Sequence, residues 1–277
     1  MRAFCTIALC HVVLTAGCSA STSQTEDTTP ETTAASDATG STEAPAGDDT
    51  HQRALEAAQA FGEALGPILS TVPDDRAFEA CERSNELIAR ANALNEVGVP
   101  AGVSDADAYR EELARLPAAV TMMATYCGRG VETVPANLWV SAELTFYRLL
   151  FLLEPTLAPT SEAGPNESSH VAAARAVLAA LAPVVSAHRE DRSRVLCEQL
   201  DPLVASVERL AGEGTPSDTP AARNYTEESE RLTSEANAAS TQCGEGSESM
   251  SSDLSVTIEV AADRLWLMLH RRWPGAS

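Results

Sequence analysis

The chain has 277 residues and a formal net charge of −21, and all 19 of its basic residues are arginines. The absence of lysine excludes a phosphate-loop lysine, a Schiff-base lysine and a lysine nucleophile. The strong acidity argues against nucleic-acid binding, which needs a positive patch, and against electrostatic attraction to anionic lipid.

The N-terminal segment has the pattern of an export signal. Arg2 precedes an uncharged, mostly apolar run that ends at Leu14, and small residues then lead to Gly17 and Cys18. The run is too short to span a bilayer and is typical of a cleaved signal peptide. With a cysteine directly after the small residues, the segment resembles the bacterial lipoprotein signal class.

This resemblance implies that residues 1–17 are removed and that Cys18 becomes the first residue and carries a lipid such as palmitate. The mature protein would then be anchored in the bacterial cell envelope. An ordinary cleaved signal peptide is the alternative.

Residues 18–50 contain Ser, Thr, Ala, Pro, Gly and acidic residues but no arginine and no large apolar side chain. Such a composition buries too little surface to offset its ordering entropy, so this segment is expected to be a disordered tether.

The rest of the chain is a tandem duplication. Shifting the sequence by 116 residues aligns it with itself without a gap, so that Cys81-Glu82 falls on Cys197-Glu198, Tyr109 on Tyr225, and Arg148-Leu149 on Arg264-Leu265. Self-similarity at a fixed period indicates a repeated structural unit. We therefore divide the chain into repeat one, residues 51–158, and repeat two, residues 159–277.

Each repeat is expected to be all-helical, because Ala, Leu, Glu and Arg dominate and apolar residues recur at three- and four-residue spacing. The expected helices lie near 52–71, 75–96, 104–126 and 136–154 in repeat one, and near 169–188, 191–211, 220–242 and 252–272 in repeat two. Short connections favour antiparallel neighbours, and hence an up-down four-helix bundle in each repeat. One intertwined eight-helix domain is the alternative.

The cysteines divide into classes. Cys5 and Cys10 lie in the expected signal peptide. The four cysteines of the repeats are spaced equally, 46 residues apart in each copy. In an antiparallel pair the start of the second helix lies beside the end of the third, and an exported domain favours disulfides. We therefore expect one disulfide in each repeat, Cys81–Cys127 and Cys197–Cys243. Free thiols or a metal site are the alternatives.

Recurring charged residues are the candidates for chemistry. The positions along the helices favour structural ion pairs between Glu112 and Arg148 and between Glu228 and Arg264. The alternative is a carboxylate cluster able to do acid–base work, formed by Glu82, Glu112 and Glu143. The sequence contains no phosphate loop, no Gly-x-Ser-x-Gly elbow and no histidine pair at a ligand spacing. We therefore expect no cofactor, no metal and no enzymatic activity.

One difference between the repeats suggests a contact surface. Repeat one has large apolar residues where repeat two has small or polar ones. The residues concerned are Met122, Met123, Trp139, Phe146 and Tyr147. They serve either internal packing or an external site for a protein partner, where such residues are favoured.

The sequence is thus typical of a non-enzymatic envelope lipoprotein that acts as a helical binding or scaffold module. Its expected partners are the membrane, through the lipid, and an envelope protein. The alternative is a receptor for a small ligand held in a core cavity. A large apolar cavity ringed by a few polar groups would favour the receptor, and an exposed apolar patch would favour the protein partner.

Overall fold

The computed structural model describes the following residues: 46–70, 76–128, 136–159, 167–189, 197–217, 219, 222–244 and 252–276. The expected signal peptide, Cys18 and the tether up to residue 45 lie outside them. Helices account for most of the described residues, which contain no β-strand, so the predicted all-α class is confirmed.

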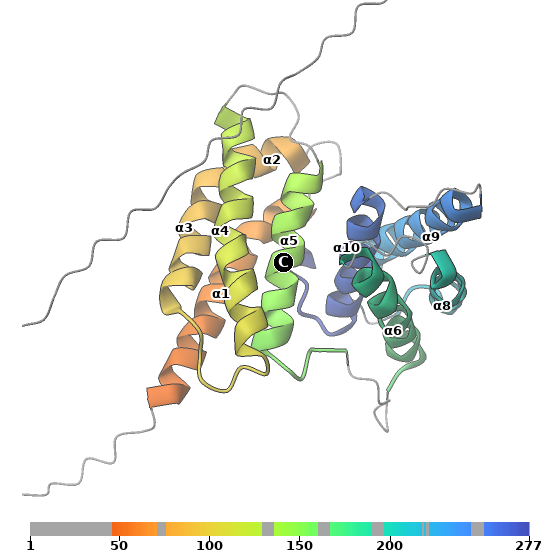
Figure 1. The fold of residues 1–277 in the computed structure, drawn as a ribbon, viewed down its shortest axis with the longest axis horizontal. Coiled ribbons are helices and arrows are strands. Elements are labelled where there is room, and N and C mark those ends of the chain that lie inside the picture. The colour runs from red at the N-terminus through yellow and green to blue at the C-terminus, as the bar shows by residue number, and fades with distance from the viewer. Residues whose placement is uncertain are drawn as a thin grey trace, which may run out of the picture. The chain divides into compact units, whose positions relative to one another are not determined.

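Repeat one is a bundle of antiparallel helices (Figure 1). Its helices are α1 (Ala46–Ser70), α2 (Arg76–Glu82), α3 (Ser84–Val97), α4 (Ala106–Gly128) and α5 (Ala136–Leu153). The helix expected over 75–96 is divided into α2 and α3 at Arg83. Helix α3 packs against α1 and α4, and α5 closes the bundle by packing against α4 and α1.

Repeat two has the same arrangement. Its described helices are α6 (Ser169–Arg189), α8 (Leu200–Glu213), α9 (Ala222–Gly244) and α10 (Ser252–Leu269), followed by the short 3₁₀ helix η1 (Pro274–Ala276). Helix α8 packs against α6 and α9, and α10 packs against α9 and α6. The predicted tandem pair of four-helix bundles is therefore confirmed, and the two copies also contact each other through α5 and α10.

The helix ends follow local chemistry. Helix α1 begins at Ala46, inside the segment expected to be a disordered tether, so the tether prediction was wrong for residues 46–50. Asp49 lies 4.0 Å from Arg53 one turn later, an arrangement that stabilises a first turn.

Gly98 and Gly214, which match under the shift of 116, end α3 and α8 with φ of 77° and 74°. Glycine adopts this left-handed conformation at little cost, so both helices stop at the same place.

The two predicted disulfides are confirmed. Cys81 is bonded to Cys127 with a Cα–Cα distance of 5.3 Å, and Cys197 is bonded to Cys243 with a Cα–Cα distance of 5.5 Å. Each bond joins the segment before α3 or α8 to the C-terminal end of α4 or α9. The disulfides therefore hold the same corner of each bundle.

Helices α5 and α10 form the centre of the described fold. Every residue from Val260 to Met268 in α10 is buried, and most of α5 is buried as well.

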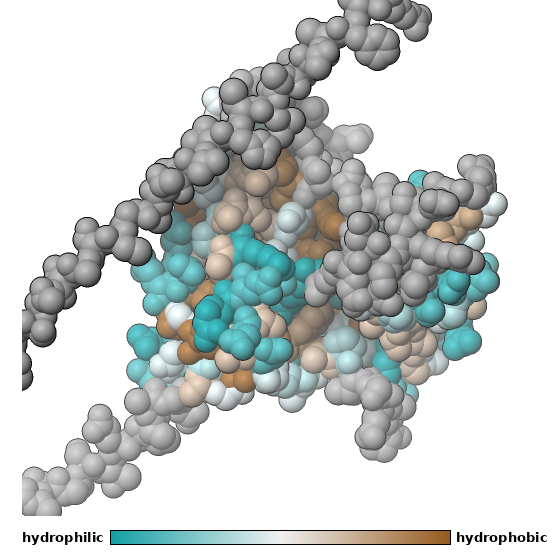
Figure 2. Space-filling model, viewed as in Figure 1, coloured by the Kyte–Doolittle hydropathy of each residue, from teal (hydrophilic) through white to brown (hydrophobic). Residues whose placement is uncertain are grey.

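Among the described helices, α6 is long and apolar enough to cross a membrane by length and composition, with 33% of the relevant window buried. Hydrophilic residues cover much of the face drawn in Figure 2, with hydrophobic residues visible between them.

Candidate functional site: a charged seam and its pocket

Arg264 makes a buried ion pair across the boundary between the repeats. It lies in α10, and its side chain is 1% exposed. Its Nε and Nη2 atoms donate to the two carboxylate oxygens of Glu143 in α5, at 2.6 and 2.5 Å. Its Nη1 atom donates to Glu228 in α9 at 2.9 Å. One guanidinium therefore joins a carboxylate from each repeat.

The same arrangement occurs with the repeats exchanged. Arg148 lies in α5, and its Nη2 atom donates to Glu259 in α10 at 2.5 Å. Its Nη1 atom lies 3.5 Å from Oε1 of Glu112 in α4. We call the six residues of these two sets the charged seam: Glu112, Glu143, Arg148, Glu228, Glu259 and Arg264.

The structure thus places both sequence-expected pairs, Glu112–Arg148 and Glu228–Arg264, within contact distance. It does not form the alternative carboxylate cluster. Glu143 binds Arg264, Glu112 faces Arg148, and Glu82 is exposed. The ion pairs that cross between the repeats were not predicted from the sequence. Their signal was the recurrence of Glu and Arg five residues apart in both α5 and α10, a spacing that points the two side chains in different directions.

The residues beside the charged seam differ between the two copies. Tyr147 in α5 donates its hydroxyl hydrogen to Glu143 at 2.5 Å and accepts a hydrogen bond from Nε1 of Trp273 at 3.2 Å. Burial raises the pKa of Tyr147 well above its usual value, so it remains a donor. In repeat two the matching residue is Asp263, which is shorter and is an acceptor when ionised. Trp273 itself matches Leu157, which has no side-chain donor.

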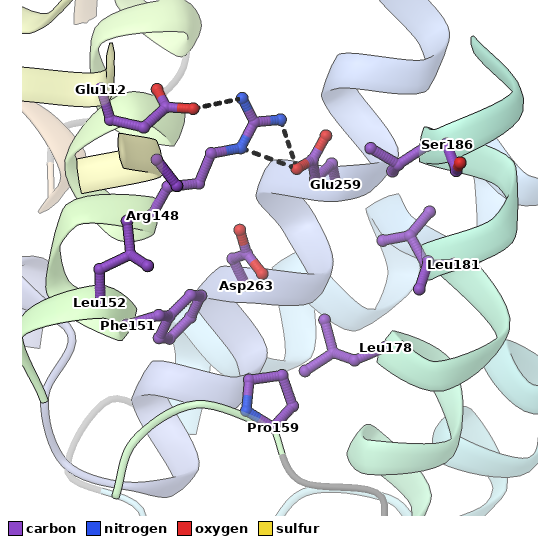
Figure 3. A pocket seen from close by; sticks show the side chains of 13 residues that line it. Glu112, Arg148, Phe151, Leu152, Pro159, Leu178, Leu181, Ser186, Glu259 and Asp263 are labelled. Atoms are coloured by element: carbon purple, nitrogen blue, oxygen red, sulfur yellow. Dashed lines mark hydrogen bonds and ion pairs between the residues drawn. The ribbon is translucent and has the colours of Figure 1, made fainter. Parts of the chain in front are cut away.

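A pocket of about 490 Å³ lies on the Asp263 side of the seam. It is bounded by α4, α5, α6, α10 and the segment after α5 (Figure 3). Its lining residues are Ala108, Glu112, Arg148, Phe151, Leu152, Pro159, Leu178, Leu181, Ala182, Val185, Ser186, Glu259 and Asp263. Most of the wall is thus apolar, and the charged residues gather at one end.

The polar end of the pocket is rich in acceptors. Asp263 points toward Arg148 and Glu259, and it makes no hydrogen bond with the other described residues that line the pocket (Figure 3). The Oε2 atom of Glu112 is buried and has no hydrogen-bond partner among the described residues. Burial raises the pKa of Asp263 well above its usual value; Glu259 and Glu143 raise it further, and Arg148 opposes them.

We expect Asp263→Asn to increase the free energy of unfolding near pH 8 by on the order of 1–2 kcal/mol, because an unpaired buried charge costs more than an amide. The raised pKa means that the folded chain binds more protons than the unfolded chain. Stability therefore falls as pH rises from the unfolded pKa, about 4, toward the folded one. Urea unfolding of both proteins should show a small difference at pH 4 and a larger one at pH 8. An equal difference at both pH values would contradict the raised pKa of Asp263.

Of the two alternatives for the large residues of repeat one, internal packing holds for four of the five, and the external partner patch is wrong for these four. Met123, Trp139, Phe146 and Tyr147 are all buried, and Met122 alone of the five is exposed, at 52%. The large residues fill the interior of repeat one: the Phe146 ring lies 4.9 Å from that of Phe61. Of their counterparts in repeat two, Asp263, which matches Tyr147, lines the pocket described above.

A second pocket, of about 520 Å³, lies between α1, α5 and the segment leading to η1. Its charged lining residues include Arg272 and Glu154, which form an ion pair with each other. With Glu63 and Arg271 also in its lining, this pocket has two carboxylates and two guanidinium groups, whereas the pocket beside Asp263 has three carboxylates and one guanidinium.

No group of three or more His, Cys, Asp or Glu residues able to hold a metal ion occurs among the described residues. In the comparisons with known proteins, no family model, no curated protein and no solved structure matches the chain. The site must therefore be interpreted from its own chemistry, which offers apolar contact along its walls and hydrogen-bond acceptors at one end.

Proposed function

We propose that this chain is a non-enzymatic, lipid-anchored receptor of the bacterial cell envelope that binds a small, partly apolar molecule in the pocket beside Asp263. The pocket itself carries the proposal. Its volume of about 490 Å³ falls in the range of small-molecule sites, and its apolar wall with a few convergent polar groups is their usual lining. The burial of Trp139, Phe146 and Tyr147 counts against the first expectation from the sequence, a scaffold module that would bind a protein partner through an exposed patch.

The proposed cellular location rests on the lipoprotein-like signal that ends at Cys18. Two disulfides within the repeats are compatible with it, because disulfides persist in oxidising compartments. An extracytoplasmic receptor would meet molecules that arrive from outside the cell, and the lipid would keep it at the membrane surface.

Cys18→Ser should release the protein from the membrane fraction, because the thiol is the attachment point for the lipid. Fractionation and intact mass spectrometry measure this change. Cys10→Ser is the matched control, since that cysteine lies inside the expected signal peptide, and it should leave membrane association and mature mass unchanged. Retention of the Cys18→Ser protein in the membrane with an unchanged mass would refute the anchor.

Ligand binding is tested by filling the pocket. Ala182 lines it from α6 and is exposed, so a larger side chain enters the pocket without disturbing the bundle core. We expect Ala182→Trp to weaken binding of a neutral fluorescent probe such as N-phenyl-1-naphthylamine by about ten-fold, or about 1.4 kcal/mol. The titration uses the full chain with Cys18→Ser, which removes the need for detergent that would compete with the probe.

Ala172→Trp provides the matched control. Ala172 is also an exposed alanine of α6, but it does not line the pocket. The probe should bind this variant as it binds the parent chain. Equal affinities for the parent and Ala182→Trp would place probe binding elsewhere and contradict the receptor function.

A further inference from the structure

We infer, on the basis of the proposed function, that the ligand is an organic cation: a protonated amine on an apolar body, with its ammonium group beside the carboxylates of Asp263 and Glu259. The first reason is the balance of hydrogen-bonding groups. The guanidinium of Arg148 already donates to Glu259 and faces Glu112. What remains at the polar end is the carboxylate of Asp263, which has no hydrogen-bond partner among the lining residues. A ligand group with several N–H donors satisfies this acceptor.

The charges support the same ligand class. Three carboxylates, those of Glu112, Glu259 and Asp263, line the pocket beside one guanidinium, that of Arg148. Arg115 also contacts Glu112, but its side chain is 50% exposed and therefore screened by solvent. An anionic ligand would add negative charge beside these carboxylates in a partly buried site, which strongly disfavours it. A cation supplies the missing positive charge and favours the ionised form of Asp263.

Among the described residues, the matching side of the seam, around Glu143 and Tyr147, has no unpaired acceptor of this kind. On the side of the seam away from the pocket, Tyr147 donates to Glu143, and Arg264 binds both Glu143 and Glu228. There the protein itself provides the hydrogen-bond donor, which is the Tyr147 hydroxyl group. On the pocket side, Asp263 stands in place of this tyrosine, so that both the space and the donor can come from a ligand.

The walls require that the cation be organic. Phe151, Leu152, Leu178 and Leu181 form much of the remaining surface. An inorganic ion would bring a water shell against these side chains, whereas an alkyl or aromatic body buries them. The ligand class is therefore amphiphilic, with one charged end and one apolar end.

The test compares three probes with the same eight-carbon chain: n-octylammonium, 1-octanol and octanoate. Calorimetric titration into the full chain with Cys18→Ser at pH 7.5 should give at least ten-fold tighter binding of n-octylammonium than of 1-octanol, with octanoate weakest. Asp263→Asn keeps the shape of the side chain. It should weaken n-octylammonium binding by about ten-fold and leave 1-octanol binding unchanged.

Asp201→Asn is the control for a general loss of negative charge, because Asp201 is an exposed residue of α8 that does not line the pocket. It should leave all three affinities unchanged. If 1-octanol binds as tightly as n-octylammonium and Ala182→Trp abolishes both, the cation inference is overturned while the receptor function stands. If none of the probes binds, or all bind Ala182→Trp as they bind the parent chain, both are overturned.

Discussion

Replacement of Arg264 by methionine is expected to lower the free energy of unfolding by on the order of 3–5 kcal/mol, the usual cost of removing one partner from a buried ion pair. Methionine fills much of the same volume, so the loss is mainly electrostatic. Glu143 and Glu228 would remain in the core, at 0% and 7% side-chain exposure, without the guanidinium that now binds them. Urea unfolding followed by circular dichroism at pH 7 measures the change.

Arg148→Met is the matched control, because Arg148 occupies the same position in repeat one. Its side chain is 21% exposed and that of Glu259 is 13% exposed, so solvent reaches this pair. We expect a smaller loss, on the order of 1–2 kcal/mol, since water compensates the carboxylates left behind. Equal losses at the two positions would show that burial does not distinguish the two halves of the seam.

Removal of a disulfide is expected to have the second largest effect. Replacing both cysteines of one pair by alanine should lower the free energy of unfolding by about 4 kcal/mol, because the cross-link no longer restricts the unfolded chain. The chain-entropy model relates this loss to the separation of the cysteines, which is 46 residues in both pairs. The two double variants, at Cys81 with Cys127 and at Cys197 with Cys243, should therefore lose similar amounts.

Denaturant titrations of both double variants under non-reducing conditions test this expectation, and each double variant is the control for the other. A reducing agent should destabilise the parent chain by the combined amount and leave a chain without the four cysteines unaffected. A loss in one repeat with none in the other would show that loop closure is not the main contribution.

The sequence was sufficient for the parts of the fold that depend on local pattern and on the repeat. Apolar spacing located the helices, and the matched cysteines located the disulfides. Boundaries were less reliable. The helix expected to reach residue 272 ends at Leu269, and Arg271 has a φ of 56°, outside the helical region. Periodicity alone does not show where a chain turns away from a helix axis.

The contacts of the candidate site could not be predicted from either repeat alone. Arg148 and Arg264 each bind a glutamate of the other copy, so their principal partners follow from the way α5 meets α10. The useful signal was a substitution: Tyr147 in one copy and Asp263 in the other, among residues that otherwise recur. A change from a donor to an acceptor in a duplicated charged network indicates where the two copies have different roles.

The most direct measurement of the receptor function is mass spectrometry of small molecules extracted from the protein after purification from its own membrane. The same extraction from Ala182→Trp and Ala172→Trp provides the comparison. We predict a small amphiphilic molecule at near-stoichiometric amount with the parent chain and with Ala172→Trp, and its loss from Ala182→Trp. Identical extracts from all three proteins would contradict a ligand in the pocket beside Asp263.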